Sequence, residues 1–240
     1  MSRVSEANVD RSSRIVLLNR FSVDFGGNVQ RVPGSVQRLL AFVSLHEGPV
    51  SRQRAAFTLW PTANEAHAYG SLRTALFRLR AGREGQLFEA GSDLKLRSSV
   101  GVDVRRARSL AATLGEPVVR RGDEQELEAL LLGGELLPDW YDDWVIFERE
   151  RFRQLRLRAL EAFCDRLTRA GRLAEALEVG LLCVAGEPLR ESAHRAVMRV
   201  YLADGNPGDA IHQYQLCERL FGEQLGIRPS AQMQELLPQS

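Results

Sequence analysis

Apolar and polar residues first alternate along this chain and then follow a helical period. Residues 14–25 mix β-branched and aromatic residues with partial alternation, which predicts one or two short strands. The Gly-Gly-Asn sequence at 26–28 predicts a turn, and residues 29–32 predict a return strand. The chain is therefore expected to open with a small β-meander.

Three amphipathic helical patterns follow, each with recognisable start or stop residues. The first ends at Gly48, the second starts at Ser51 and ends before Pro61, and the third covers residues 64–81. Two short alternating runs at 87–97 then flank an Ala-Gly-Ser-Asp turn, which predicts a β-hairpin. Strands, three helices and a hairpin are the order of a winged helix-turn-helix, with the third helix as recognition helix and the hairpin as wing.

After a junction at residues 98–104, the pattern is helical and contains a repeat. Gly171 and Gly205 are 34 residues apart, and so are Cys183 and Cys217. A 34-residue period with glycine at a turn is typical of tetratricopeptide hairpins.

The predicted fold class is therefore mainly α with a small β component. An N-terminal winged helix-turn-helix is followed by an all-α tetratricopeptide-like helical array. We expect a flexible leader at residues 1–13, a winged-helix DNA-binding domain at 14–101 and the helical domain at 102–240.

Charge separates the same two parts. The chain has 32 basic residues, of which only Lys95 is a lysine, and a net charge of +1. Residues 1–100 carry 14 basic and 8 acidic side chains, whereas the remainder carries 18 basic and 23 acidic ones. A basic half joined to an acidic half predicts two domains with different partners.

The third helical pattern, SLRTALFRLRAG at 71–82, is the candidate DNA-reading element. Leu72, Leu76 and Leu79 form one inward stripe, and no acidic residue lies between positions 66 and 83. A solvated helix usually mixes charges, whereas a helix facing phosphate omits acids. The alternative is a surface helix whose arginines extend over apolar neighbours.

Eight side chains are expected to contact DNA, in three roles. Residues at 73, 74 and 77 face base edges, with the phenyl ring at 77 touching a thymine methyl group. Residues at 52, 78 and 80 bind phosphates, and those at 95 and 97 extend from the wing. The predicted set is Arg52, Arg73, Thr74, Phe77, Arg78, Arg80, Lys95 and Arg97.

Longer motifs give a resemblance to a known family. LLAFVSLHEGPVSR, LW at 59–60 and SLRTALFRLR resemble the response-regulator type of winged helix. GELLPDW, DDWVIFERER, GEPLRESAHRAVMRVYLADG and DAIHQYQLCERLFGEQLGIRPS resemble the bacterial transcriptional activator domain. Over residues 14–237, the chain resembles the SARP family of antibiotic-pathway regulators.

That resemblance implies a transcriptional activator with double-stranded promoter DNA and RNA polymerase as partners. Such proteins bind direct repeats in the major groove, usually as two protomers per site, so a homodimer on DNA is implied. The wing sequence GSDLKLR lacks the aromatic residue that the family often has near Asp93, and Phe77 stands where a polar residue is commoner. Both departures bear on base preference.

Other function classes have less support. The main alternative is a tetratricopeptide-type adaptor that binds proteins without contacting DNA. No catalytic, cofactor or metal site is expected, because Lys95 does not follow a glycine as a P-loop requires and no histidine pair has zinc-protease spacing. No apolar run is long enough to cross a bilayer, and the polar N-terminus has no signal-peptide core, so we expect a cytoplasmic protein without membrane contact.

Four further expectations concern single residues. The histidines at 67, 194 and 212 are expected at the surface or at helix caps, and the three cysteines in the interior. Asp142 and Asp143 are expected near a helix start, where they favour the helix dipole. Trp140 and Trp144 are expected on one helix face, where they anchor that helix to its neighbours.

Overall fold

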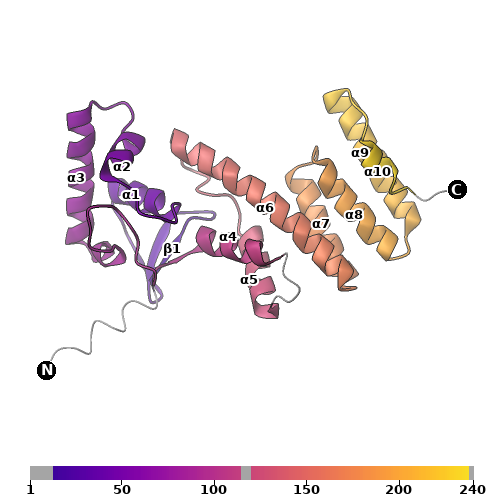
Figure 1. The fold of residues 1–240 in the computed structure, drawn as a ribbon, viewed down its shortest axis with the longest axis horizontal. Helices are drawn as coiled ribbons and strands as arrows, with labels where there is room; N and C mark the ends of the chain where they lie inside the picture. Colours follow the sequence, from indigo (N-terminus) through magenta and orange to yellow (C-terminus); the bar gives the residue numbers. More distant parts are fainter. Residues whose placement is uncertain (1–12, 115–119, 238–240) are drawn as a thin grey trace. The chain divides into compact units, whose positions relative to one another are not determined.

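The computed structural model describes residues 13–114 and 120–237 (Figure 1). The chain divides into two compact units. The first takes in the chain up to Leu110 together with Arg121–Phe152, and the second takes in Ala111–Arg120 and Arg153–Ser240. The expected leader at 1–13 lies outside the described residues, except for Ser13, which begins the first strand.

A four-stranded sheet opens the first unit. Its strands are β1 (Ser13–Val16), β2 (Ser22–Phe25), β3 (Asn28–Gln30) and β4 (Gly101–Val102), in the order β3-β2-β1-β4. The predicted meander is present, with β1, β2 and β3 antiparallel. Strand β4 pairs parallel to β1 and was not predicted, because two residues are too few to give a periodic pattern.

The helix-turn-helix consists of α1 (Gly34–Ser44), α2 (Arg52–Leu59) and α3 (Glu65–Ala81). Both predicted N-caps are present. The Ser51 hydroxyl accepts a hydrogen bond from the Arg54 backbone N–H at 3.2 Å, and the Asn64 side-chain oxygen accepts one from that of His67 at 3.0 Å. These bonds satisfy backbone donors that the first helical turn leaves without partners, and so fix where α2 and α3 begin.

The wing follows a short 3-10 turn, η2 (Arg83–Leu87). Phe88 and Leu96 form an antiparallel bridge, and the Glu89 N–H donates to the Lys95 carbonyl at 2.9 Å. The predicted hairpin is therefore paired as expected, but through isolated bridges and not through two continuous strands. Its first arm starts after η2, and Leu94 and Leu96 hold the second arm against the core.

The first unit continues into α4 (Asp103–Thr113), α5 (Arg121–Leu132) and the start of α6 (Asp143–Arg169). Asp103, the first residue of α4, accepts backbone N–H bonds from Leu17 and Leu18 at 2.8 and 2.9 Å. Burial raises the pKa of Asp103, although these bonds and one from Val104 act in the opposite direction. Its carboxylate thereby ties α4 to the end of β1.

Arginines of α4 terminate α1. Arg105 donates to the backbone carbonyls of Ser44 at 2.7 Å and Val43 at 2.9 Å, and also to that of His46, while Arg108 donates to Leu45 at 3.0 Å. The last carbonyls of a helix have no donor within the helix. The guanidinium groups of Arg105 and Arg108 supply the missing donors. Burial lowers the pKa of Arg105.

The second unit consists of the rest of α6, α7 (Leu173–Gly186), α8 (Glu191–Ala203), α9 (Pro207–Leu225) and α10 (Ala231–Gln234). Figure 1 shows α8 beside α7 and beside α9, in orange to yellow. The repeat glycines Gly171 and Gly205 have φ of 72° and 74°, a left-handed conformation that glycine adopts without strain. The predicted fold class, a winged helix followed by an all-α helical array, is confirmed.

Three of the single-residue expectations need comment. His194 was expected at the surface or a cap and is fully buried, where its Nε2 bonds the Pro188 carbonyl at 2.9 Å and its Nδ1 bonds Gln213 at 2.7 Å. The cysteines are buried as expected. Trp140 precedes α6 and does not share a helix face with Trp144, although the two rings pack edge-on at 6.3 Å.

Candidate nucleic-acid interface

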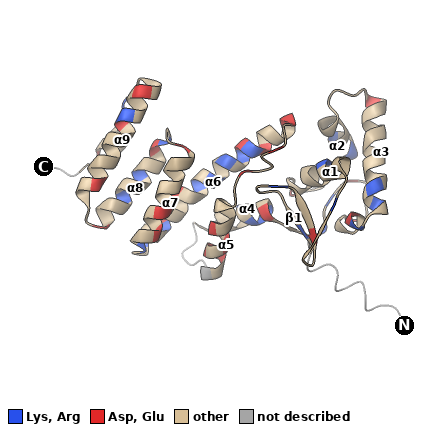
Figure 2. Ribbon diagram, turned by 180° about the vertical axis from the view of Figure 1, so that it is seen from behind, with Lys and Arg blue, Asp and Glu red and all other residues tan. Residues whose placement is uncertain are grey.

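Helix α3 presents two faces of opposite character. Its inward stripe of Ala68, Leu72, Ala75, Leu76 and Leu79 is buried. At about 100° per residue, Phe77 lies nearly opposite this stripe, and its side chain is 74% exposed. Figure 2 shows acidic colouring only at the start of α3, which is Glu65, and basic colouring along its second half. The outer face is therefore exposed, basic and free of acids after its first turn.

All eight predicted contact residues are exposed, and the structure groups them on three segments of the first unit. One lies at the start of α2, five lie on α3 and two lie on the second arm of the wing. In chain order they are Arg52, then Arg73, Thr74, Phe77, Arg78 and Arg80, then Lys95 and Arg97.

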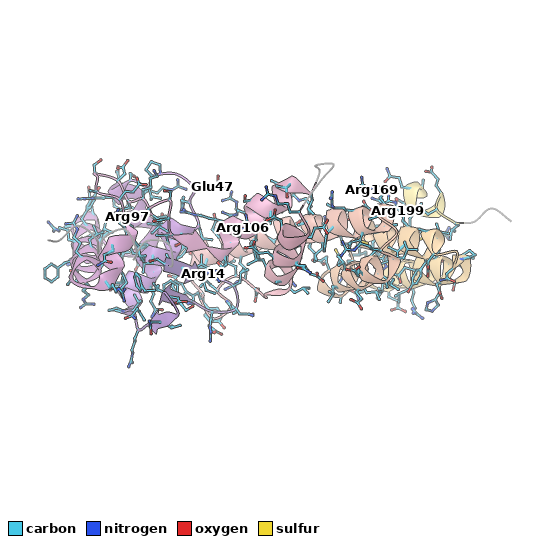
Figure 3. All side chains as sticks on the ribbon, turned by 90° about the horizontal axis from the view of Figure 1, so that it is seen from below. Arg14, Glu47, Arg97, Arg106, Arg169 and Arg199 are labelled. Atoms are coloured by element: carbon cyan, nitrogen blue, oxygen red, sulfur yellow. The ribbon has the colours of Figure 1, made fainter. Side chains whose placement is uncertain are left out.

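The positive side chains of this group differ in how they are bonded. Arg73 and Arg80 have no hydrogen-bond or ion-pair partner among the residues that the structure describes. Lys95 forms an ion pair with Glu89 at 3.0 Å, within the wing. The exposed arginine Arg106 of α4, labelled with Arg97 in Figure 3, is instead paired with Asp123 at 2.8 Å and Glu126 at 2.7 Å. Unpaired charge is thus available on α3.

One flank of α3 borders a hollow of about 350 Å³ beside α1. Arg78 donates to the Ser35 hydroxyl across it at 3.5 Å, and the Thr74 hydroxyl donates to the Gly70 carbonyl of its own helix at 3.0 Å. Ser35 is the second residue of α1, so this hollow also borders the positive end of a helix dipole. Its remaining lining residues are Trp60, Ala66, His67, Gly70 and Ser71.

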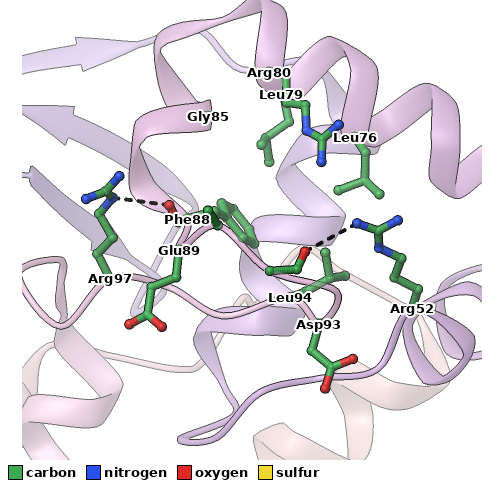
Figure 4. Close-up of a pocket in the computed structure, with 12 residues that line it drawn as sticks. Arg52, Leu76, Leu79, Arg80, Gly85, Phe88, Glu89, Asp93, Leu94 and Arg97 are labelled. Atoms are coloured by element: carbon green, nitrogen blue, oxygen red, sulfur yellow. Dashed lines mark hydrogen bonds between the residues drawn. The ribbon is translucent and has the colours of Figure 1, made fainter.

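The opposite flank borders a second hollow of about 280 Å³, between α3 and the wing (Figure 4). Arg80, Arg52 and Arg97 line it from three different segments. Arg97 donates to the Phe88 carbonyl at 3.1 Å, and Arg52 lies 3.5 Å from the Gly91 carbonyl, so both brace the wing. Glu89 and Asp93 also line the hollow, and in Figure 4 their carboxylates point away from Arg80.

Helical geometry relates the two hollows to the outer face. Arg78 and Arg80 project to opposite flanks of α3, and Arg73, Thr74 and Phe77 occupy the face between them. An anionic strand on each flank with base edges between them is the arrangement that a major groove offers to a helix.

Sequence reasoning missed the partners of these side chains. Nothing in the sequence indicated that Ser35 contacts Arg78, because serine is common in the first turn of a helix. His67 was expected at the surface or at a cap; it is exposed, and its ring nitrogen lies 2.8 Å from the oxygen of the N-cap residue Asn64. Among the described residues, no group of three or more metal-ligating side chains is present, and no helix is both long and apolar enough to span a membrane.

A profile of the bacterial transcriptional activator domain matches residues 102–239. The chain belongs to the bacterial transcriptional activator domain family. Over 214 residues it is 28% identical to regulatory protein AfsR of Streptomyces griseus, and over 215 residues it is 28% identical to regulatory protein AfsR of Streptomyces coelicolor. Each match covers 85% of this chain but 22% of the relative, so the chain spans about a fifth of their length.

A solved structure shares the fold. Mycobacterium tuberculosis EmbR, determined in complex with a low-affinity phosphopeptide, superposes with a TM-score of 0.74 at 17% identity. The match covers 95% of this chain and 66% of EmbR. At this identity the likeness shows the fold alone, a winged helix followed by the helical array that contains the family domain.

Proposed function

We propose that this chain is a transcriptional regulator of the SARP type, a sequence-specific DNA-binding activator of transcription that acts in the bacterial cytoplasm. Helix α3 enters the major groove of promoter direct repeats, one protomer per repeat, and the protein helps RNA polymerase to engage. The observation that carries the proposal is the exposed outer face of α3, which has no acidic residue after Glu65 and carries two arginines, Arg73 and Arg80, without a partner among the described residues. A polyanion is the partner that such a face would attract.

The two hollows suggest how DNA is held. Arg73, Thr74 and Phe77 face base edges, and the apolar ring of Phe77 suits a thymine methyl group. Arg78 on one flank and Arg80 on the other bind phosphates of the two strands. Arg52, Arg97 and Lys95 support the wing side, where Lys95 must first exchange Glu89 for a phosphate.

Salt dependence and substitution test the proposal together. With about four phosphates neutralised per protomer, the logarithm of affinity should fall with the logarithm of salt with a slope of roughly −4. The double variant R73A/R78A should bind a promoter duplex roughly tenfold or more weaker, because it removes one base-facing and one phosphate-facing arginine. Binding is measured by fluorescence anisotropy on duplexes from the protein's own upstream region.

The matched control is R219A/R228A, which removes two exposed arginines from the second unit. It lowers the net charge equally but should leave DNA affinity nearly unchanged. Equal loss in both double variants would mean that only total charge matters. Unchanged binding by R73A/R78A would remove α3 as the reading helix.

The helical hairpins supply an observation in favour of a second function. Leu181, Leu182 and Ile211 are 43%, 43% and 39% exposed on α7 and α9, which suits a protein-binding adaptor. An adaptor without DNA contact would show no salt-dependent duplex binding, so the same titration separates the two functions.

A further inference from the structure

A second exposed surface in the first unit lies where α6 begins. Tyr141, Ile146 and Phe147 are 81%, 48% and 73% exposed, although apolar side chains of this size are usually buried. Asp139 and Asp143 are exposed beside them in the chain. We call these five residues the acidic–aromatic patch.

Local geometry brings the apolar members together. Asp142 precedes α6 and its carbonyl accepts the N–H bonds of Val145 and Ile146 at 2.8 and 3.1 Å, so it occupies the N-cap position. Tyr141 and Ile146 then hold the N′ and N4 positions, which lie on the same side of a helix start. Phe147 is the next residue of the same turn, so the three side chains cover one end of α6.

The patch stands on a rigid support. Arg149 donates to the backbone carbonyls of Leu136 at 2.9 Å, Leu137 at 2.5 Å and Trp140 at 2.8 Å, which fixes the segment leading into α6. The Leu137 N–H bonds the Leu17 carbonyl at 2.9 Å, which joins this segment to the sheet.

Aromatic rings support the patch from below. Trp144 packs edge-on against Phe42 of α1 at 5.4 Å, and Trp140 packs on Phe21 at 5.7 Å. These contacts fix Trp140 and Trp144, the chain neighbours of Tyr141 and Asp143. Rigid, exposed aromatic residues are the typical composition of protein-binding hot spots.

Charge selects the kind of partner. Residues 135–151 contain six acidic and two basic side chains, and the start of α6 is coloured red in Figure 2. Asp139 and Asp143 form no ion pair among the residues that the structure describes, whereas Asp142 is paired with Arg38. The exposed carboxylates of Asp139 and Asp143 disfavour phosphate, so the patch does not suit DNA, and an apolar surface ringed by lysine and arginine complements it.

We propose that the acidic–aromatic patch docks a basic, apolar-lined protein surface of the promoter-bound transcription machinery. This inference rests on the proposed function, since it names the surface through which the protein helps polymerase to engage. The patch and α3 belong to the same compact unit, so a partner held on the patch stays next to the bound promoter.

The test uses the full chain and purified RNA polymerase holoenzyme from a Streptomyces host. Y141S/F147S removes the aromatic contacts, and D139N/D143N removes two charges with little change of shape. The matched control is L225S/I227S, which changes two apolar residues of 48% and 53% exposure in the second unit. Polymerase affinity is measured by biolayer interferometry with and without operator duplex, and each variant is checked by circular dichroism melting.

We expect Y141S/F147S to weaken polymerase binding roughly tenfold or more, with unchanged duplex affinity and unchanged melting. D139N/D143N should weaken it less and should flatten its dependence on salt. The control should bind polymerase as the wild type does.

Several outcomes would overturn the inference. Unchanged polymerase binding in both patch variants, or an equal loss in the control, would remove the patch as a docking surface. Loss of self-association in sedimentation velocity would assign the patch to a second copy of the chain, and loss of duplex binding would assign it to DNA. If the wild type binds polymerase through the patch but binds no operator duplex, the docking surface stands and the DNA-reading proposal alone fails.

Discussion

Arg149 offers the sharpest test of how the first unit is held together. Its guanidinium bonds three backbone carbonyls at 2.9 Å or less, and its side chain is only 18% exposed. A hydrogen bond from a charged donor contributes roughly 1.5–3 kcal/mol, and an acceptor left unsatisfied in the interior costs about 1–3 kcal/mol. Because water can reach part of this site after truncation, we expect Arg149→Ala to lower the free energy of unfolding by about 3 kcal/mol. This is closer to the contribution of one such bond than to that of three.

The assay is thermal and urea unfolding followed by tryptophan fluorescence. Trp140 and Trp144 lie in or beside the segment that Arg149 fixes, so their emission reports on this region. A loss of about 3 kcal/mol corresponds to a fall in Tm of roughly 6–12 °C for a unit of this size. Arg149→Lys should fall between wild type and alanine, since an ammonium group is a compact charge that cannot span several carbonyls.

Arg151 is the control. It lies two residues further along the same helix, is 72% exposed and forms one surface pair with Glu148 at 2.6 Å. Its replacement by alanine should cost about 0–1 kcal/mol. If Arg149→Ala were no more destabilising than Arg151→Ala, the carbonyl bonds would contribute nothing and the support beneath the acidic–aromatic patch would have to be attributed to ring packing alone.

Three further predictions concern the second unit. Burial lowers the pKa of His194, so below about pH 6.5 the unfolded chain binds a proton that the folded chain does not bind, and stability should decline as the pH falls. Urea midpoints measured at pH 7 and 5.5 should show a smaller decline in His194→Gln than in the exposed control His212→Gln. At Gly180 a Cβ would lie 2.9 Å from a Val197 methyl carbon, so Gly180→Ala should destabilise by roughly 1–3 kcal/mol, whereas Gly222→Ala, with open space around it, should stabilise by about 0.5–1 kcal/mol in the same unfolding assay. Burial raises the thiol pKa to about 11 for Cys164, about 12 for Cys183 and about 11 for Cys217. Iodoacetamide at pH 8 should therefore label none of them in the native protein and all of them in urea. Rapid labelling of the native protein, observed by mass spectrometry, would contradict their burial.

The elements that could be predicted from sequence are those that depend on neighbouring residues. Ser51 and Asn64 cap their helices through bonds to residues three positions on, so the signal and its cause lie in the same short segment. The buried stripe of α3 and the 34-residue repeat are likewise local or periodic. The same reasoning found the exposed positions of the candidate interface, because exposure follows from the helical period on α3 and from alternation on the wing.

What could not be predicted depends on partners distant in sequence. Arg105 bonds carbonyls about 60 positions earlier, and nothing in its own neighbourhood separates it from the exposed Arg106 beside it. His194 is buried because Gln213 and the Pro188 carbonyl satisfy both ring nitrogens, which only the packed hairpins bring together. Trp140 and Trp144 have helical spacing, but α6 starts between them, so their ring contact arises from a turn and not from a shared helix face.

These arginines show why composition alone is a weak guide to function in this chain. The basic excess of residues 1–100 is small, and much of the positive charge in the first unit is directed at protein acceptors: Arg105 at carbonyls, Arg106 at two carboxylates, Arg149 at the segment before α6. Arg73 and Arg80 differ from them by lacking such partners among the described residues, while standing on a helix that is otherwise well packed. An exposed cation without a protein partner exchanges only water when an anion binds, whereas a paired one must first give up its partner. It is therefore the lack of partners for Arg73 and Arg80 within the described part of the chain, more than the number of arginines, that favours DNA as the ligand of α3.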